Sequence, residues 1–300
     1  MKLFWHIFLF SLLIMSSLSA QGEHGDGLFL MKIEQGASAT GMGVAVVSLN
    51  GDPNFIEYNP AGAVGVEKFT VSFGHNDYWE NIRLESGYFA KNLNNRWYLH
   101  GKIRYATVDE LELRESPSSI PDGYFEAQDV SFKSGLAYQI NKSISAGFAI
   151  GWFVEKIGSY RGSTFNVDFG LQNKINENIT LGASVTNLGK HFRLELEGTQ
   201  HSNYITLPTS YRFGGSYKYD KYLGALDFVY IDEELKTNLG AVGKLHEYIT
   251  ARVGYMINYD SKNFTAGLSF NFNNMIVDYG FVPFKNNLGT SHSFNLTFSL

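Results

Sequence analysis

The last seven residues are Phe294-Asn295-Leu296-Thr297-Phe298-Ser299-Leu300, in which large apolar side chains alternate with small polar ones. A period of two is that of a β-strand with two different faces. The same alternation runs through residues 249–259 and 264–272. In a soluble sandwich the apolar face would cover a core. In a membrane barrel it would meet lipid, and the polar face would line the lumen.

The first twenty residues favour the membrane barrel. Met1-Lys2 precede an apolar run over residues 3–13, and small residues follow up to Ala20. This is the pattern of a secretory signal peptide, so we expect residues 1–20 to be removed. The run is too short for a spanning helix, and no later stretch has about 18 consecutive apolar residues. The sequence therefore predicts a bacterial outer-membrane protein surrounded by outer-membrane lipid.

Composition agrees with one exported all-β domain. Aromatic residues make up 15% of the chain, and there are 31 glycines but only 6 prolines. The absence of cysteine excludes disulfides and thiolate metal sites. The formal net charge of -5 argues against a nucleic-acid partner.

Alternation predicts an antiparallel transmembrane β-barrel of about fourteen strands over residues 67–300, an even number of suitable length. The two long connections, Val108 to Phe125 and Gly189 to Thr206, are the third and the seventh. Both then lie on one rim, which we expect to be external, while the even-numbered connections are tight turns.

Residues 21–66 differ from the rest and are predicted to form a hatch inside the barrel. They are rich in glycine and other small residues, which allow close backbone packing in a narrow lumen. Two short motifs stand out. Their residues are Gly41, Met42, Gly43 and Ala45, and Asn59, Pro60, Ala61 and Gly62.

These motifs, with Asp278-Tyr279-Gly280-Phe281-Val282-Pro283-Phe284 and Leu288-Gly289-Thr290-Ser291-His292 near the end, make the chain resemble the PorV/PorQ family of FadL-like outer-membrane proteins. The resemblance implies a 14-stranded barrel with an N-terminal hatch. It implies either a part in type IX protein secretion or the passage of long-chain fatty acids and other hydrophobic compounds.

Assigning lumen faces by alternation predicts a basic inner wall. Its basic residues are Arg83, Lys102, Arg104, Lys133, Arg212, Lys218, Lys236, Lys244 and Arg252, against the acidic residues Glu85, Asp168, Asp227 and Asp278. The hatch is acidic, with Glu23, Asp26, Glu34, Asp52 and Glu57 against Lys32.

Two hypotheses explain this charge pattern. Hatch and wall charges could pair, because unpaired buried charge is costly. Alternatively, part of the wall could bind a hydrophobic anionic small molecule through guanidinium groups. The candidates for either role are Arg104, Arg212, Arg252, Lys236 and Lys244.

No catalytic pattern emerges from the sequence. The histidines are scattered singly, and no serine, histidine and carboxylate are brought together. The acidic stretch from Glu110 to Glu115 is expected to be a solvated loop rather than a calcium loop. We therefore predict a protein that is not an enzyme, with no metal and no cofactor.

The sequence favours a PorV/PorQ-type barrel that takes part in protein secretion or surface attachment through its external loops. Its partners would be secreted cargo proteins and other secretion-system subunits. The alternative is a FadL-like channel for hydrophobic compounds.

Overall fold

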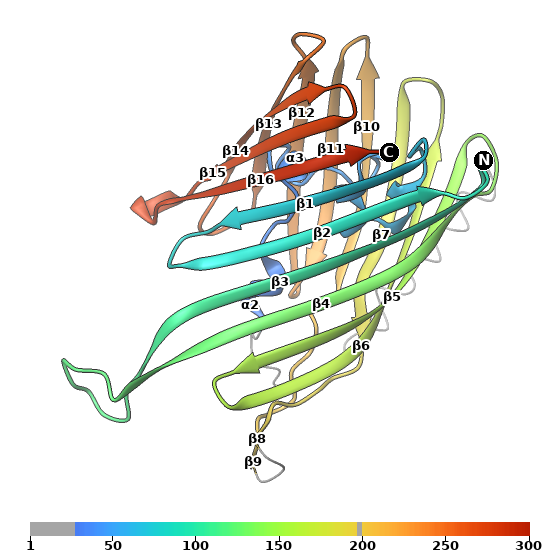
Figure 1. Cartoon of the computed structure of the whole chain (residues 1–300). Helices are drawn as coiled ribbons and strands as arrows, with labels where there is room; N and C mark the ends of the chain where they lie inside the picture. The colour runs from blue at the N-terminus through green and yellow to red at the C-terminus, as the bar shows by residue number, and fades with distance from the viewer. Residues whose placement is uncertain (1–27, 197–199) are drawn as a thin grey trace.

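The computed structural model describes residues 28–196 and 200–300, in which fourteen antiparallel strands close into one barrel (Figure 1). The predicted signal peptide and residues 21–27 lie outside the described residues. The barrel strands are β1 (Phe69–Asp77), β2 (Ile82–Asn92), β3 (Trp97–Leu113), β4 (Gly123–Gln139), β5 (Ile144–Ile157), β6 (Tyr160–Lys174), β7 (Ile179–Gly189), β10 (Ser210–Tyr219), β11 (Tyr222–Ile231), β12 (Glu234–Lys244), β13 (Ile249–Ile257), β14 (Phe264–Phe272), β15 (Met275–Pro283) and β16 (Thr290–Ser299).

The C-terminal stretch with alternating apolar and polar residues forms the strand that closes the barrel. β16 pairs with β1 in antiparallel register, Phe298 opposite Val71 and Leu296 opposite Phe73. Asn295 and Thr297 are buried on the inner face, while Phe294 is exposed on the outer one. The predicted fourteen-stranded antiparallel barrel is confirmed.

The rim that carries the long connections is called the long-loop rim. Half of the connection predicted over Val108 to Phe125 is strand, because β3 runs to Leu113 and β4 begins at Gly123. A register shift separates Val108 from Leu111, which pairs with Phe125. The expectation of a solvated loop from Glu110 was therefore wrong over its first residues, where apolar and acidic residues alternate as in a strand. In Figure 1 this hairpin projects well past its neighbours.

The other long connection lies between β7 and β10 and carries a small hairpin, β8 (Glu195–Leu196) with β9 (Gln200–His201). Figure 1 places it on the same rim as the β3–β4 hairpin, as predicted. The opposite rim carries the short turns and Leu300, and we call it the short-turn rim. In outer-membrane barrels the longer loops are external.

A belt of large apolar side chains covers the outside of the barrel. Exposed members include Phe73, Ile103, Phe132, Ile150, Phe165, Phe213, Phe228, Val253, Leu268 and Phe294. Within the described residues, no helix has the length and hydropathy needed to span a membrane.

Residues 28–66, which we call the plug segment, fold against the inner face of the barrel (Figure 1). Their short helices are α2 (Phe29–Lys32), α3 (Ala37–Thr40), η1 (Pro53–Glu57) and η2 (Pro60–Ala63). α3 contacts β14, β15 and β16, whereas η2 contacts β4, β5 and β6, so the segment reaches across the lumen.

The local sequence explains the turns of the plug segment. The Asp52 side chain accepts a hydrogen bond from the Asn54 amide at 2.9 Å, and the Asn59 side chain accepts one from the Ala61 amide at 3.0 Å. In each case a proline occupies the first helical position. Caps of this kind followed by proline favour a helical turn, which explains the Asn59-Pro60-Ala61-Gly62 motif.

Glycines on the inner wall let the plug segment pack backbone to backbone. A Cβ atom on Gly267 would lie 3.0 Å from the Cα of Gly41. Other wall glycines whose Cβ would collide with the plug segment are Gly147, Gly170, Gly182, Gly240, Gly254 and Gly280. The backbone of the Gly41-Met42-Gly43 motif therefore packs directly against glycines on the strands that face it.

Wall side chains also satisfy the plug backbone. The Asp227 carboxylate accepts hydrogen bonds from the amides of Val46 and Val47 at 2.8 and 2.9 Å. Thr265 accepts one from Gly43, and Asn295 accepts one from Ala37. Because buried backbone groups need partners, these contacts hold the segment in place. We propose that the plug segment closes the pore.

Substituting Gly254 by Leu tests this closure. The new side chain would occupy the position of the Gly43 backbone, so we expect plug displacement and raised single-channel conductance in planar bilayers. Gly224→Leu is the control, because Gly224 is exposed and has an open Cβ position. Equal conductance in the two variants would contradict closure by this segment.

The apolar belt predicts a difference between the two faces of β14. Leu268→Arg should destabilise the folded barrel by about 2–4 kcal/mol, because it puts a charge near the middle of the lipid-facing surface. Asn271→Arg enters a large internal cavity and should be milder. Urea unfolding in lipid vesicles would measure both, and similar losses would mean that the faces are misassigned.

Candidate functional site

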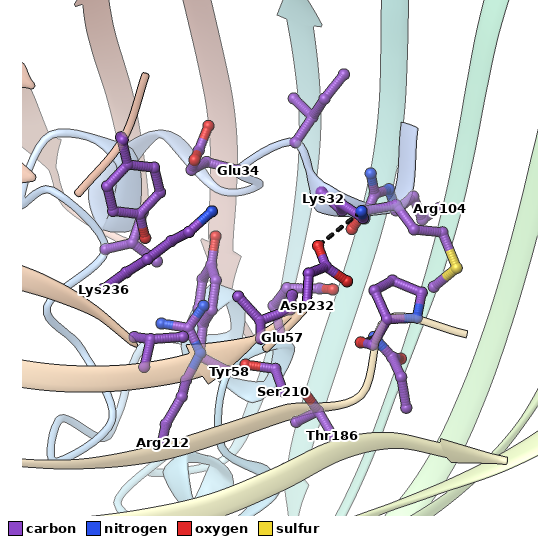
Figure 2. Close-up of a pocket in the computed structure, with 18 residues that line it drawn as sticks. Lys32, Glu34, Glu57, Tyr58, Arg104, Thr186, Ser210, Arg212, Asp232 and Lys236 are labelled. Carbon is purple, nitrogen blue, oxygen red and sulfur yellow. Dashed lines mark hydrogen bonds and ion pairs between the residues drawn. The ribbon is translucent and has the colours of Figure 1, made fainter. Parts of the chain in front are cut away.

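A cavity of about 90 Å³ lies inside the barrel, toward the long-loop rim (Figure 2). The plug segment forms one side through residues such as Met31, Val44 and Tyr58, and strands on the wall form the rest. Asp232, in the β11–β12 turn on the long-loop rim, marks its outer end. A single water needs about 10–15 Å³ of such space, so the cavity has room for a larger group.

Each acidic residue that lines this cavity is paired with a lysine. Asp232 lies 2.6 Å from Lys32, as the dashed line in Figure 2 marks. Glu34 lies 2.5 Å from Lys262. Glu57 lies 3.3 Å from Lys102. The direct ion-pair partner of each acid is therefore a lysine and not an arginine of the cavity.

Arg104 and Arg212 are left without a carboxylate partner among the described residues. Arg104 donates from Nη1 to the Met31 carbonyl at 2.9 Å, but its Nε and Nη2 are buried without an acceptor. The Arg212 guanidinium carbon lies 4.9 Å from the centre of the Tyr58 ring, and its Nη1 has no acceptor. The buried Ser210 hydroxyl also lacks a partner.

The unpartnered atoms of Arg104, Arg212 and Ser210 are all able to donate, and all three residues line one cavity (Figure 2). The same lining holds one carboxylate oxygen without a hydrogen bond, Glu57 Oε2, which lies 3.3 Å from the Lys102 amino group. A buried donor without an acceptor costs about 1–3 kcal/mol, and guanidinium forms its strongest hydrogen bonds with oxyanions. The arrangement is therefore suited to a carboxylate or a similar anion. Apolar side chains complete the lining, namely Met31, Ile33, Val44, Pro208, Val229 and Ile231.

Lys236 adds a weaker positive charge to the same cavity. Its amino group lies 5.0 Å from the centre of the Tyr259 ring and 3.2 Å from a carboxylate oxygen of Glu234. Since Glu234 is exposed, the lysine remains only loosely neutralised.

A buried ion cluster next to the cavity links the plug segment to the wall. Lys133 lies 2.6 Å from Asp168, and Lys102 lies 3.6 Å from Asp168 and 3.3 Å from Glu57. β6 and β7 shift register beside Asp168, whose carboxylate accepts the Asn187 amide at 2.7 Å. The shift thus lets one carboxylate serve both strands.

Two groups of the plug segment have altered pKa values in this environment. Burial opposes ionisation of Glu57, but Lys102, Arg104 and Lys133 outweigh it and lower the pKa of that carboxyl. Burial, reinforced by the Glu57 charge, raises the pKa of the Tyr58 hydroxyl. Glu57 therefore stays ionised and Tyr58 stays neutral near pH 7.

The structure brings together three of the five basic candidates, Arg104, Arg212 and Lys236. Arg252 instead lines a second cavity of about 670 Å³ toward the short-turn rim, where it lies 3.5 Å from Asp278 and contacts Ser269. Lys244 is exposed at the end of β12. The plug segment lies between the two cavities and lines both.

Two lumen assignments from the sequence were wrong. Arg83 and Glu85 lie on the outer face of β2 and contact Asp109 and His75, whereas Ile82 faces inward. The inward apolar residues of β2 pack against Leu30 and Ile33 of the plug segment. Because the plug makes part of the interior apolar, hydrophobicity alone does not identify the lipid face there.

Tyr259 was also placed on the wrong face. The sequence pattern groups it with the lipid-facing residues of β13, but it lines the cavity. Asn258 has a φ of 67°, which breaks the alternation just after β13 ends at Ile257. Sequence reasoning also missed two residues. Ser210 could have been found, because it shares a strand face with Arg212. Lys262 lies outside any strand, so the alternation gave no signal for it.

No cluster of three or more metal-ligating His, Cys, Asp or Glu side chains occurs among the described residues. No family model matches the sequence, and no curated protein does.

Solved structures match the whole barrel. The monoaromatic hydrocarbon channel CymD is 14% identical with a TM-score of 0.63, covering 88% of this chain and 97% of CymD. The Pseudomonas putida toluene transporter TodX is 12% identical with a TM-score of 0.64, covering 88% and 96%. A Pseudomonas aeruginosa FadL homologue is 10% identical with a TM-score of 0.56, covering 88% and 98%.

The fold is FadL-like. With the apolar belt, this places the chain in the outer membrane. The similar structures carry the names of channels and transporters. None of the reported likenesses points to the PorV/PorQ group in particular or to protein secretion.

The buried cluster predicts a large effect of Asp168→Asn. The substitution leaves Lys133 and Lys102 buried with only Glu57 nearby, so we expect a loss of about 3–5 kcal/mol in the free energy of unfolding. Adding Lys133→Met should recover part of the loss. Glu177→Gln, which removes an exposed pair with Lys174, is the control and should have little effect. A loss no greater than that of the control would contradict the cluster.

Proposed function

We propose that this protein is an outer-membrane channel for hydrophobic small molecules that carry an acidic head group. The observation that carries the proposal is the set of buried, unpartnered donors of Arg104, Arg212 and Ser210 on one partly apolar cavity. The cavity lies toward the long-loop rim, on the side from which external compounds would enter. The proposal involves no catalytic step and no cofactor.

The similar structures support the proposal of a channel, and the lining of the cavity supports the proposal that its ligand has an acidic head group. CymD and TodX are named for hydrocarbons, which are neutral and offer no hydrogen-bond acceptor. A hydrocarbon ligand would leave the guanidinium and hydroxyl donors of the cavity without an acceptor. Each unpaired donor would then cost its desolvation free energy. A carboxylate supplies the missing acceptors, and the apolar lining suits the attached chain.

The head-group proposal predicts that decanoate binds more tightly than decanol to the purified, folded protein. Arg104→Gln combined with Arg212→Gln should weaken decanoate binding at least tenfold and leave decanol binding unchanged, because only the anion needs the guanidinium groups. Isothermal titration calorimetry in detergent would measure both ligands.

Lys244→Gln is the matched control, since it removes an exposed positive charge from the same barrel. It should leave both affinities unchanged. If the double variant bound decanoate as tightly as the wild type, the cavity would not be the head-group site. Uptake of radiolabelled decanoate by cells would then test whether the chain transports acids by another route.

Protein secretion remains a prediction of the sequence resemblance. The placement of both long connections on one rim agrees with it, since such loops could dock cargo or other secretion subunits. Removing residues 114–122 separates the two functions. Loss of a surface protein from the cell surface, with unchanged decanoate binding, would favour secretion. An unchanged set of surface proteins would count against secretion and would leave the channel as the one proposed function.

A further inference from the structure

Three basic side chains lie close together on the short-turn rim, at the opposite end of the barrel from the long loops. Lys91 lies next to the end of β2, Arg96 lies in the β2–β3 turn and Lys142 lies in the β4–β5 turn. All three residues are exposed. The two turns are neighbours, because β3 pairs with β4 and the Arg96 carbonyl accepts the Gln139 amide at 2.8 Å. We call these three residues the basic patch.

The basic patch is not neutralised by the protein. No ion pair or side-chain hydrogen bond among the described residues includes any of its members. Glu67 and Lys68 lie beside it, since the Lys68 carbonyl accepts the Asn92 amide at 2.7 Å, but their charges cancel. Even with the carboxylate of Leu300, which lies across β1, three positive charges face one negative charge.

The part of the same rim formed by β10–β13 has a different balance of charge. Its lysines alternate with acidic residues along the β10–β11 and β12–β13 turns, namely Lys218, Asp220, Lys221, Lys244 and Glu247. The two turns are joined by a hydrogen bond from the Lys244 amide to the Lys221 carbonyl at 3.1 Å. These lysines therefore provide a matched control for the basic patch.

The outer surface next to the basic patch is apolar. Lys91 faces outward, because its neighbour Ala90 is buried against the plug segment. Leu99 is the direct partner of Lys91 across β2 and β3, and Leu136 is the direct partner of Leu99 on β4. Leu136 is exposed on the lipid-facing side. The apolar belt therefore begins directly beside the positive charge.

Two aromatic rings lie at the same boundary. Trp97 and Tyr138 are direct partners on β3 and β4, and their ring centres are 4.5 Å apart. Trp97 directly follows Arg96 and is exposed on the outer face. Tryptophan and tyrosine are enriched at the level of the lipid headgroups. This boundary places the basic patch at headgroup depth.

We propose that the basic patch binds the phosphate of an anionic phospholipid in the periplasmic leaflet. The short-turn rim faces that leaflet when the long loops are external. Ammonium and guanidinium groups bind phosphate oxygens, and basic residues at a membrane surface attract anionic lipids. A zwitterionic phospholipid carries a cation of its own, which the patch repels. The acyl chains of the bound lipid contact the adjacent leucines. This site is independent of the proposed channel function.

Trp97 supplies a local reporter for the test. Trp79→Phe combined with Trp152→Phe leaves it as the one tryptophan of the mature chain after residue 20. The folded full-length mature protein is placed in phosphatidylcholine vesicles that contain either brominated phosphatidylglycerol or brominated phosphatidylcholine, and bromine quenches a nearby tryptophan. The relative association constant from this quenching should favour phosphatidylglycerol at least about fivefold. High salt should reduce the preference, because the patch is exposed.

Two triple variants in this background assign the preference to the patch. Lys91→Gln, Arg96→Gln and Lys142→Gln together should remove it, while quenching by brominated phosphatidylcholine persists and reports that the barrel is still inserted. Lys218→Gln, Lys221→Gln and Lys244→Gln together should retain it, although they remove the same charge from the same rim.

Equal quenching by the two brominated lipids before the patch is changed would overturn the proposal. An undiminished preference in the patch variant would do so as well. A preference that soluble glycerol phosphate removes would assign the patch to a free phosphate ester and would also contradict a lipid site.

Discussion

The structure depends on the close approach of the plug backbone to a wall that has no side chains at the points of contact. A closed barrel of this size leaves a lumen that must be filled or left open. Glycines such as Gly254 and Gly267 remove the Cβ atoms that would keep the plug segment away. Polar wall residues such as Asp227 then reach its buried amides. Plug and barrel are therefore parts of one core.

This close packing also determines where charge can lie. Glu34 and Glu57 belong to the plug segment and meet Lys262 and Lys102 of the barrel, so pairing between plug and wall accounts for much of the charge pattern. The pairing does not use every charge. Arg104 and Arg212 remain available to a ligand. Pairing between plug and wall, the first explanation suggested by the sequence, thus holds for part of the wall, and the proposed ligand role concerns the arginines that this pairing leaves.

The sequence predicted the barrel well because each strand repeats a period of two and outer-membrane barrels follow simple rules of strand number and loop length. It predicted less well which residues face the lumen and which face lipid on strands that contact the plug segment. On β2 the inward positions are apolar because they touch Leu30 and Ile33, so Arg83 was assigned to the wrong side. At Tyr259 a single residue with positive φ, Asn258, reversed the expected direction.

The candidate site was predicted in part, for a related reason. Alternation shows that Arg104, Arg212 and Arg252 point inward, but it does not give their depth along the barrel or their partners. Arg252 meets Asp278 on one side of the plug segment, whereas Arg104 and Arg212 lie on the other. Which arginine stays free depends on contacts between residues far apart in the sequence.

The plug segment is part of the candidate site as well as the proposed barrier below it. The Met31 carbonyl holds one nitrogen of Arg104, and the ring of Tyr58 lies against the guanidinium of Arg212. Neither contact supplies a carboxylate, so both guanidinium groups are positioned while Arg104 Nε and Nη2 and Arg212 Nη1 have no acceptor. The proposed binding and the proposed closure consequently involve the same residues. A ligand that draws Arg104 away from Met31 would weaken a contact between plug and wall, and this gives an anion a direct means to act on the barrier.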